Sequence, residues 1–188
     1  MKKVILIILL LTNFNLVAQE QLPYYKIPKM EENYTAQTTV ARIIDGLGFR
    51  YFWASEGLTV EDLKYQPSGK GRTSLETIQH IYDLSVTMLR LTKTYFNQAK
   101  DKNEMSFSEM RRQTLLNIEA FRNKILFTKD LKELSVKKED EVSIPFFYMI
   151  NGPIADAIWH TGQISSFRRS SGNPINPKVN FFSGTVRE

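Results

Sequence analysis

The fold is decided by one stretch, residues 73–99, which reads TSLETIQHIYDLSVTMLRLTKTYFNQA. Thr73 and Glu76 have the spacing of a capping box, so a helix is predicted to begin here and to continue to about Ala99. At about 100° per residue, one set of side chains falls within an arc of about 100°, the width of a core-facing stripe. This set is Thr77, His80, Ile81, Leu84, Met88, Leu91 and Tyr95. His80 lies at the edge of the predicted buried face.

Two more helices are predicted on either side of this stretch. Residues 35–55 carry apolar side chains at helical spacing, namely Val40, Ile43, Ile44, Leu47, Tyr51 and Ala54. Gly46 and Gly48 interrupt the pattern at a cost of roughly 1 kcal/mol each relative to alanine, unless they let a neighbouring helix approach closely. Ser106 and Glu109 form a second capping box. The helix that it opens repeats Met110, Thr114, Ile118, Phe121 and Ile125 along one face.

A last helix is predicted from about Ser143 to about Ser170, and Gly172 ends it. Pro153 lies inside this pattern and removes one backbone hydrogen bond, so we expect a kink or a break beside it. Arg168 and Arg169 fall in the last turn, where positive charge suits the helix dipole.

The remaining segments are predicted to connect or flank these helices. Residues 20–34 contain two prolines and are predicted to be an extended leader, and residues 173–188 an extended tail that lies on the helices. Residues 129–141 are highly charged and are predicted to be a solvated connection. No segment shows convincing strand alternation. The sequence therefore predicts an all-α fold, a four-helix bundle over residues 35–172 with extended N- and C-terminal segments.

The first residues have the pattern of a targeting segment. Lys2 and Lys3 precede an unbroken apolar run, Val4–Leu11, which is too short to span a bilayer. This arrangement predicts a signal peptide over residues 1–19, with cleavage after Ala18 or Gln19, and export to the periplasm or the medium. The alternative is an uncleaved amphipathic anchor. Since the chain has no cysteine, a lipoprotein anchor is excluded.

Composition and charge exclude several function classes. Apolar residues make up 42% of the 188-residue chain, enough for the core of one domain. Removing Lys2 and Lys3 with the signal lowers the formal net charge from +5 to +3. Because the remaining basic residues form short pairs and no long stripe, nucleic-acid binding is not expected. The lack of cysteine excludes disulfides, a catalytic thiol and cysteine-based zinc sites.

Three residues make a candidate metal site. His80 and His160 are the only histidines, and both fall on predicted helices. Asp156 lies four residues before His160, so the two side chains share a helix face one turn apart. Two histidines and a carboxylate suit Zn, Ni, Mn or Fe(II) and leave positions for water or substrate. The alternative is structural: Asp156 caps the helix after Pro153, and the histidines are hydrogen-bonded, half-buried residues.

Other polar and aromatic residues have two interpretations each. Glu76 lies one turn before His80 and is a candidate general base or partner of a metal ligand, although its capping role suffices to explain it. Gln163 either hydrogen-bonds near the site or ends a polar face. We expect Trp53 and Trp159 to be core aromatics. Residues 69–74 lack the spacing of a phosphate loop and are predicted to be a flexible basic loop.

Several segments resemble one family of helical proteins, the DinB/YfiT-like superfamily. Asp156–Ile164, which reads DAIWHTGQI, is similar to the closing helix of that family, where H-x-x-x-H-x-G-Q-[IL] is typical. Glu76–Ile81, ETIQHI, resembles the second helix, which supplies the first metal-binding histidine. Arg42–Asp45 and Trp53–Leu58 resemble the first helix and its exit. The resemblance covers residues 35–172 and implies a four-helix bundle.

The resemblance also implies a ligand set and an activity. His80 matches the first ligand of the family and His160 the third, while Asp156 stands where a histidine is usual. An aspartate there lowers the net charge of the centre and favours harder ions, or it marks a branch that has lost the metal. Relatives are described as metal-dependent hydrolases, and some are thiol transferases or thiol-dependent isomerases. Since low-molecular-weight thiols are mainly cytosolic, the predicted export favours hydrolysis.

The sequence leaves two classes of function open. One is a divalent-metal-dependent enzyme that acts on a small molecule through a water molecule activated by Zn, Ni, Mn or Fe. The other is a binding or stress-related protein without turnover, in which the helices hold a metal, a small ligand or nothing. No nucleic acid and no lasting membrane anchor are expected as partners, and a homodimer stays open.

Overall fold

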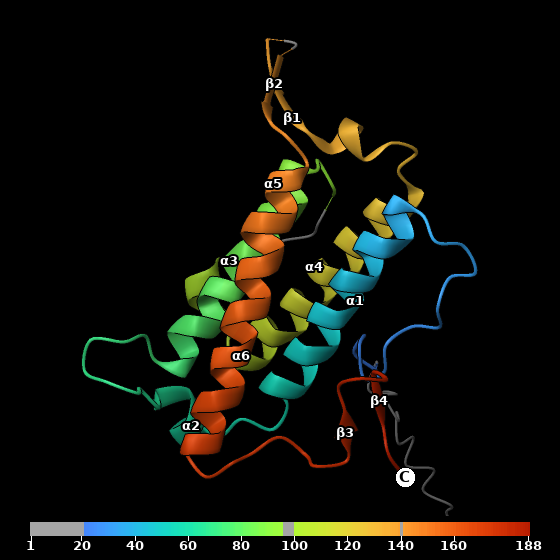
Figure 1. Cartoon of the computed structure of the whole chain (residues 1–188). Coiled ribbons are helices and arrows are strands. Elements are labelled where there is room, and N and C mark those ends of the chain that lie inside the picture. The colour runs from blue at the N-terminus through green and yellow to red at the C-terminus, as the bar shows by residue number, and fades with distance from the viewer. Residues whose placement is uncertain (1–20, 96–99, 140) are drawn as a thin grey trace, which may run out of the picture.

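The computed structural model describes residues 21–95, 100–139 and 141–188, and most of them are helical (Figure 1). The helical elements in chain order are α1 (Ala36–Ser55), α2 (Val60–Lys64), α3 (Ser74–Leu91), η1 (Lys102–Glu104), α4 (Phe107–Phe127), η2 (Leu131–Leu134), α5 (Phe147–Met149), η3 (Ile150–Ile154) and α6 (Ala155–Ser170). The strands are β1 (Val136–Lys138), β2 (Glu141–Ile144), β3 (Val179–Asn180) and β4 (Thr185–Val186). The described residues are mostly helical and have only short strands, so the all-α fold class is confirmed.

The four longest helices of the described residues enclose the core. Helix α1 packs against α4 and α6, and α3 packs against the same two helices (Figure 1). The predicted apolar face of α4 is buried along its length, from Met110 to Ile125. On α1, Ile44, Leu47 and Tyr51 are buried as expected, whereas Ile43 is 39% exposed.

Three of these helices begin where the sequence predicts, and for the same physical reason. The side chains of Thr35, Thr73 and Ser106 each accept a hydrogen bond from the backbone N–H three residues later. In return, the side chains of Thr38, Glu76 and Glu109 accept one from the cap residue's N–H. Each reciprocal pair satisfies two donors that the first turn leaves open.

Helix α3 is shorter than predicted. It ends at Leu91, not near Ala99, and Lys93 takes a left-handed backbone with φ of 52°. The N–H of Thr94 then bonds the carbonyl of Leu89 at 2.8 Å, as in a helix stop signal. Tyr95 therefore leaves the predicted core stripe and is 86% exposed. Residues 96–99 lie outside the described residues.

The last predicted helix is divided into three parts and begins later than predicted. Ser143 belongs to strand β2, and helix begins only at Phe147. The break next to Pro153 is confirmed, because η3 is a wide π-type turn in which Gly152 has φ −89° and ψ −107°. Helix α6 continues from Ala155 to Ser170 and carries the candidate ligands.

The described residues also form two short hairpins that the sequence does not indicate. Strand β1 lies in the charged connection and pairs antiparallel with β2, which follows it, and the hairpin projects from one end of the helices (Figure 1). Strands β3 and β4 pair in the tail. Strands of two to four residues are too short to show an alternating pattern, so the sequence carries no periodic signal for them.

The leader and the tail pack together on α1. Tyr24 is 4% exposed, and a Cβ added at Gly48 would lie 2.5 Å from its ring. Gly48 therefore allows the close approach of the leader, whereas the alternative drawn from the sequence was the approach of a neighbouring helix. The N–H of Ile27 bonds the carbonyl of Gly184 in the tail at 2.9 Å. Both terminal segments are thus part of the packed protein.

The two tryptophans differ in burial. Trp53 is 7% exposed and donates its indole N–H to the carbonyl of Tyr25 at 3.2 Å, so its assignment to the core is confirmed. Trp159 is 72% exposed, and the prediction that it is a core aromatic is wrong. It faces away from the packed side of α6 because that side is set by Ala157, Thr161 and Ile164.

The predicted signal peptide, residues 1–19, lies outside the described residues. Within the residues that the structure does describe, no helix is both long and apolar enough to cross a membrane.

Asp62 in α2 ties the connector to the end of α6. Its Oδ2 accepts hydrogen bonds from the N–H of Thr59 at 2.8 Å and from Nδ2 of Asn173 at 2.6 Å. Its Oδ1 accepts one from the hydroxyl of Ser171. Although burial raises the pKa of this carboxyl, the hydrogen bonds from Asn173, Ser171 and Thr59 lower it to about 2.

We expect the protein to lose stability in acid through Asp62. Its pKa in the folded state, about 2, lies below the value of about 3.9 for an unfolded aspartate. The stabilisation is therefore complete above about pH 4 and is lost as the pH falls from about 4 to about 2. Urea unfolding at pH 5 and at pH 2.5 measures it. Asp62→Asn should have a lower free energy of unfolding than the wild type at pH 5. The difference in this free energy between pH 5 and pH 2.5 should also be smaller in the variant than in the wild type. An equal difference in both proteins would show that Asp62 is not the source of the acid sensitivity.

Candidate metal centre

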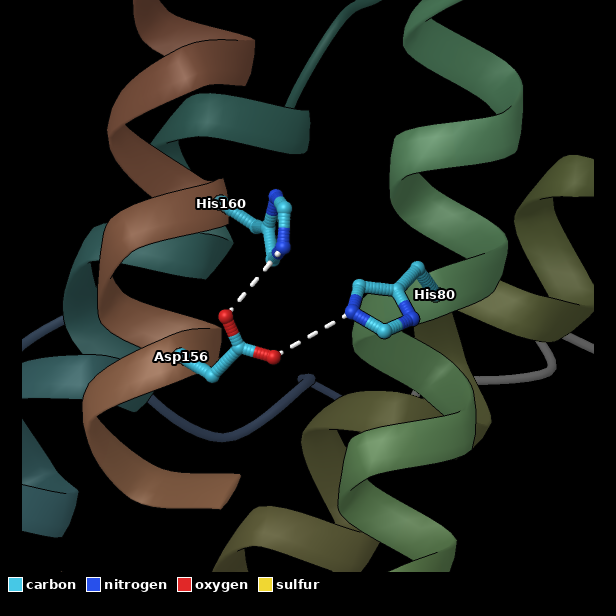
Figure 2. A group of neighbouring side chains, drawn as sticks. All are labelled: His80, Asp156 and His160. Atoms are coloured by element: carbon cyan, nitrogen blue, oxygen red, sulfur yellow. Dashed lines mark hydrogen bonds and ion pairs between the residues drawn. The ribbon is translucent and has the colours of Figure 1, made fainter. Parts of the chain in front are cut away.

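Helices α3 and α6 bring the three predicted ligands together. His80 lies in the second turn of α3, Asp156 in the first turn of α6 and His160 one turn later. Nε2 of His80 lies 3.2 Å from Oδ2 of Asp156, and Nε2 of His160 lies 3.3 Å from Oδ1 (Figure 2). The carboxylate stands between the two imidazoles, whose ring centroids are 4.6 Å apart and nearly perpendicular.

The cluster is open to solvent on one side. The side chain of Asp156 is 42% exposed, that of His80 29% and that of His160 13%. A histidine pair sealed in the core would favour a purely structural role. These exposures leave the carboxylate and the ring of His80 within reach of water or a small molecule.

Gln163 orients the ring of His160. Its Oε1 lies 2.8 Å from Nδ1 of His160, one turn further along α6. Since a carboxamide oxygen only accepts hydrogen bonds, this contact requires the tautomer in which Nδ1 carries the proton. The neutral ring then presents the lone pair of Nε2 towards Oδ1 of Asp156. Two acceptors facing each other at 3.3 Å repel unless a cation, either a proton or a metal ion, lies between them.

The donor set fits a divalent ion. One candidate ligand atom from each of the three residues lies within 4.8 Å of the other two. Ligand atoms that bind one tetrahedral ion at about 2.0–2.1 Å lie about 3.3 Å apart. Each histidine lies at about this distance from Asp156, His80 from Oδ2 and His160 from Oδ1. Two neutral nitrogens and one carboxylate are donors that Zn, Ni, Mn and Fe(II) accept. Within the described residues, no further histidine, aspartate or glutamate joins this group.

Asp156 does not cap its helix, so this part of the structural alternative is wrong. Helix α6 has Ile154 at its N-cap position, without any side-chain hydrogen bond to the first turn. Both carboxylate oxygens of Asp156 face the histidines instead (Figure 2). The position still favours a negative charge, since the first turn lies at the positive end of the helix dipole.

Glu76 has no place among the ligands. Its Oε2 accepts hydrogen bonds from the N–H of Thr73 at 2.7 Å and from the hydroxyl of Thr73 at 3.0 Å. These bonds lower the pKa of the Glu76 carboxyl. The capping role explains this residue, and the structure does not bring it to the cluster.

The chain was also compared with known proteins. No family model, curated protein or solved structure matches it.

Proposed function

We propose that this chain is a divalent-metal-dependent hydrolase of a small substrate, built on a four-helix bundle of the DinB/YfiT-like kind. The contact pattern supports the bundle, because α1 and α3 each pack against both α4 and α6. The H-x-G-Q run from His160 to Gln163 supports the family. The observation that carries the function is the meeting of His80, Asp156 and His160 at distances suited to one ion.

Each residue of the centre has a distinct task. His80 and His160 supply neutral nitrogens from two helices, so the ion would tie α3 to α6. Asp156 supplies the only negative charge among the three residues, which leaves the centre more positive than a site with two carboxylates. Gln163 keeps Nδ1 of His160 protonated and thereby leaves Nε2 free to bind.

A bound divalent ion would lower the pKa of a ligated water molecule towards neutrality and polarise the bond to be cleaved. Three protein ligands are the usual number for a catalytic site, because further positions stay available for water and substrate. The partial exposure of Asp156 and His80 gives a substrate access from solvent. The predicted export of the chain favours hydrolysis over transfer to a cytosolic thiol.

Metal analysis and a hydrolysis screen test this proposal. Mature protein purified without chelators should carry, or take up from Zn, Ni, Mn or Fe(II), one ion per chain. It should hydrolyse at least one member of a panel of small esters, amides and phosphoesters, and EDTA should remove that activity. If the protein takes up metal and hydrolyses nothing, it is a metal-binding protein and the hydrolase proposal is wrong. If the wild type takes up no metal, the metal site is refuted as well.

Substitutions at Asp156 should separate ligation from capping. Asp156→His should keep or tighten the binding of Zn and Ni, because it replaces a carboxylate with the softer imidazole. Asp156→Ala should weaken binding at least tenfold. Glu76→Ala is the matched control, because that glutamate caps α3 and touches none of the ligands. Isothermal titration calorimetry with Zn measures all three, and an equal loss in Asp156→Ala and Glu76→Ala would contradict the ligand assignment.

A further inference from the structure

A large cavity lies at the end of the helices where α1 begins. It has a volume of about 730 Å³, within the range of roughly 300–1,000 Å³ typical of small-molecule sites. The start of α1, the 3-10 turn η2 and helix α5 surround it, at the end from which the β1–β2 hairpin projects (Figure 1). Its described lining does not include His80, Asp156 or His160, so it is separate from the metal centre.

Most of the cavity wall is apolar. The apolar side chains that line it include Val40, Leu131, Pro145, Phe146, Phe147 and Ile150. Val40 and Phe146 are 7% and 6% exposed, so they belong to the core and form the floor. Phe147 and Tyr34 at the rim are 73% and 94% exposed. Exposed aromatics beside a cavity with an apolar floor favour an apolar ligand over water as its content.

The polar groups at the cavity are mostly engaged by the backbone. Oδ1 of Asp130 accepts the N–H of Lys132 at 2.9 Å and caps η2. The hydroxyl of Ser135 accepts the N–H of Phe146 at 3.1 Å, and the hydroxyl of Thr35 caps α1. The ammonium of Lys132 has no ion-pair partner among the described residues, and it is the one cation of the described lining.

We infer that the cavity binds an amphipathic carboxylate, with its hydrocarbon chain on the apolar floor and its head at Lys132. Charge complementarity decides the head group, because the ammonium of Lys132, which has no ion-pair partner in the part of the chain that the structure describes, attracts an anion. The apolar floor favours a hydrocarbon chain as the rest of the ligand, because each methylene group that binds there is removed from water. The carboxylate of Asp130, the other charged group of the described lining, offsets part of the attraction between Lys132 and an anion, so the gain from the head group is expected to be small.

Calorimetric titration with saturated fatty acids below their micellar concentrations tests the inference. EDTA is present throughout, so that no carboxylate binds through a metal ion. From octanoate to dodecanoate, affinity should rise about fourfold for each added methylene. Dodecanol should bind about fivefold more weakly than dodecanoate, because it lacks the charge that Lys132 attracts. Absence of dodecanoate binding, or equal binding of the alcohol, would overturn the inference.

Two variants place the ligand in the cavity. Ala36→Trp fills the cavity from an exposed position at its rim and should lower dodecanoate affinity at least tenfold, whereas Thr87→Trp, at an exposed position on α3 outside the lining, should not. Lys132→Gln should reduce the affinity for dodecanoate to that for the alcohol, and Lys137→Gln on the hairpin is its matched control. Circular dichroism confirms that each variant is folded. If Ala36→Trp, folded, binds dodecanoate like the wild type, the cavity is not the site.

Discussion

Replacing His160 with alanine should abolish stoichiometric metal binding and lower the melting temperature of the protein measured with metal present. His160 is the most buried of the three candidate ligands, at 13% exposure, and the one whose tautomer is set by a neighbour, Gln163. Without it, Asp156 and His80 remain as two ligands on different helices. Two ligands without a third hold a divalent ion only weakly, so uptake should fall below one ion per chain at micromolar metal.

The loss of stability follows from mass action. Metal at about 100 times its dissociation constant stabilises the folded state by about 2.7 kcal/mol, which corresponds to roughly 5–10 °C in a domain of this size. Differential scanning fluorimetry with Zn and with EDTA measures it. With EDTA the variant and the wild type should melt within a few degrees of each other. Trp159→Ala, the exposed neighbour on α6, is the control and should keep the metal-dependent shift. A His160→Ala protein that still binds one ion per chain would contradict the proposal that His160 is one of three ligands.

The starts of α3 and α4 could be predicted because the signal is local. A capping box needs only two residues three apart, so Thr73 with Glu76 and Ser106 with Glu109 specify their helices without any tertiary contact. The end of α3 was harder to predict, because Lys93 has no sequence feature that marks a left-handed conformation. The hairpins and the docking of Tyr24 on Gly48 depend on segments that meet only in the folded chain.

The candidate centre was predictable for a different reason. The chain has only two histidines, so a site that needs two nitrogens had no alternative set. Helical spacing placed Asp156 and His160 on one face, and the core stripe of residues 73–99 placed His80 at its edge. That Asp156 caps nothing could not be predicted, since it depends on the shape of the break at Gly152. The cavity at the start of α1 could not be predicted either, because three separate segments form it.

Arg168 was expected to interact only with its own helix, but it also bonds to the end of a second helix. The sequence predicts that it lies in the last turn of α6 and complements that helix's own dipole, and it does lie there. Its side chain nevertheless is buried, at 4% exposure, and reaches the end of α1. Its Nη1 donates to the carbonyls of Trp53 at 2.9 Å, Ala54 at 3.2 Å and Glu56 at 2.9 Å. Its Nε donates to the carbonyl of Asn173 at 2.6 Å. One guanidinium thus satisfies the open carbonyls of another helix.

Arg168→Met should therefore destabilise the protein by about 3 kcal/mol, because it removes several buried hydrogen bonds from a charged donor, each of which contributes about 1.5–3 kcal/mol. Methionine has a similar length and no donor, so the carbonyls at the end of α1 would be left buried and unpaired, at about 1–3 kcal/mol each where water does not reach them. Arg169→Met is the matched control: Arg169 is exposed, so its replacement should change stability by no more than about 0.5 kcal/mol. Arg168→Lys should recover only part of the loss, because an ammonium cannot reproduce the planar fork of donors. Urea unfolding followed by circular dichroism measures all three, with EDTA present so that metal binding does not contribute. A loss below about 1 kcal/mol in Arg168→Met would mean that water replaces the guanidinium and that the end of α1 is not closed by α6.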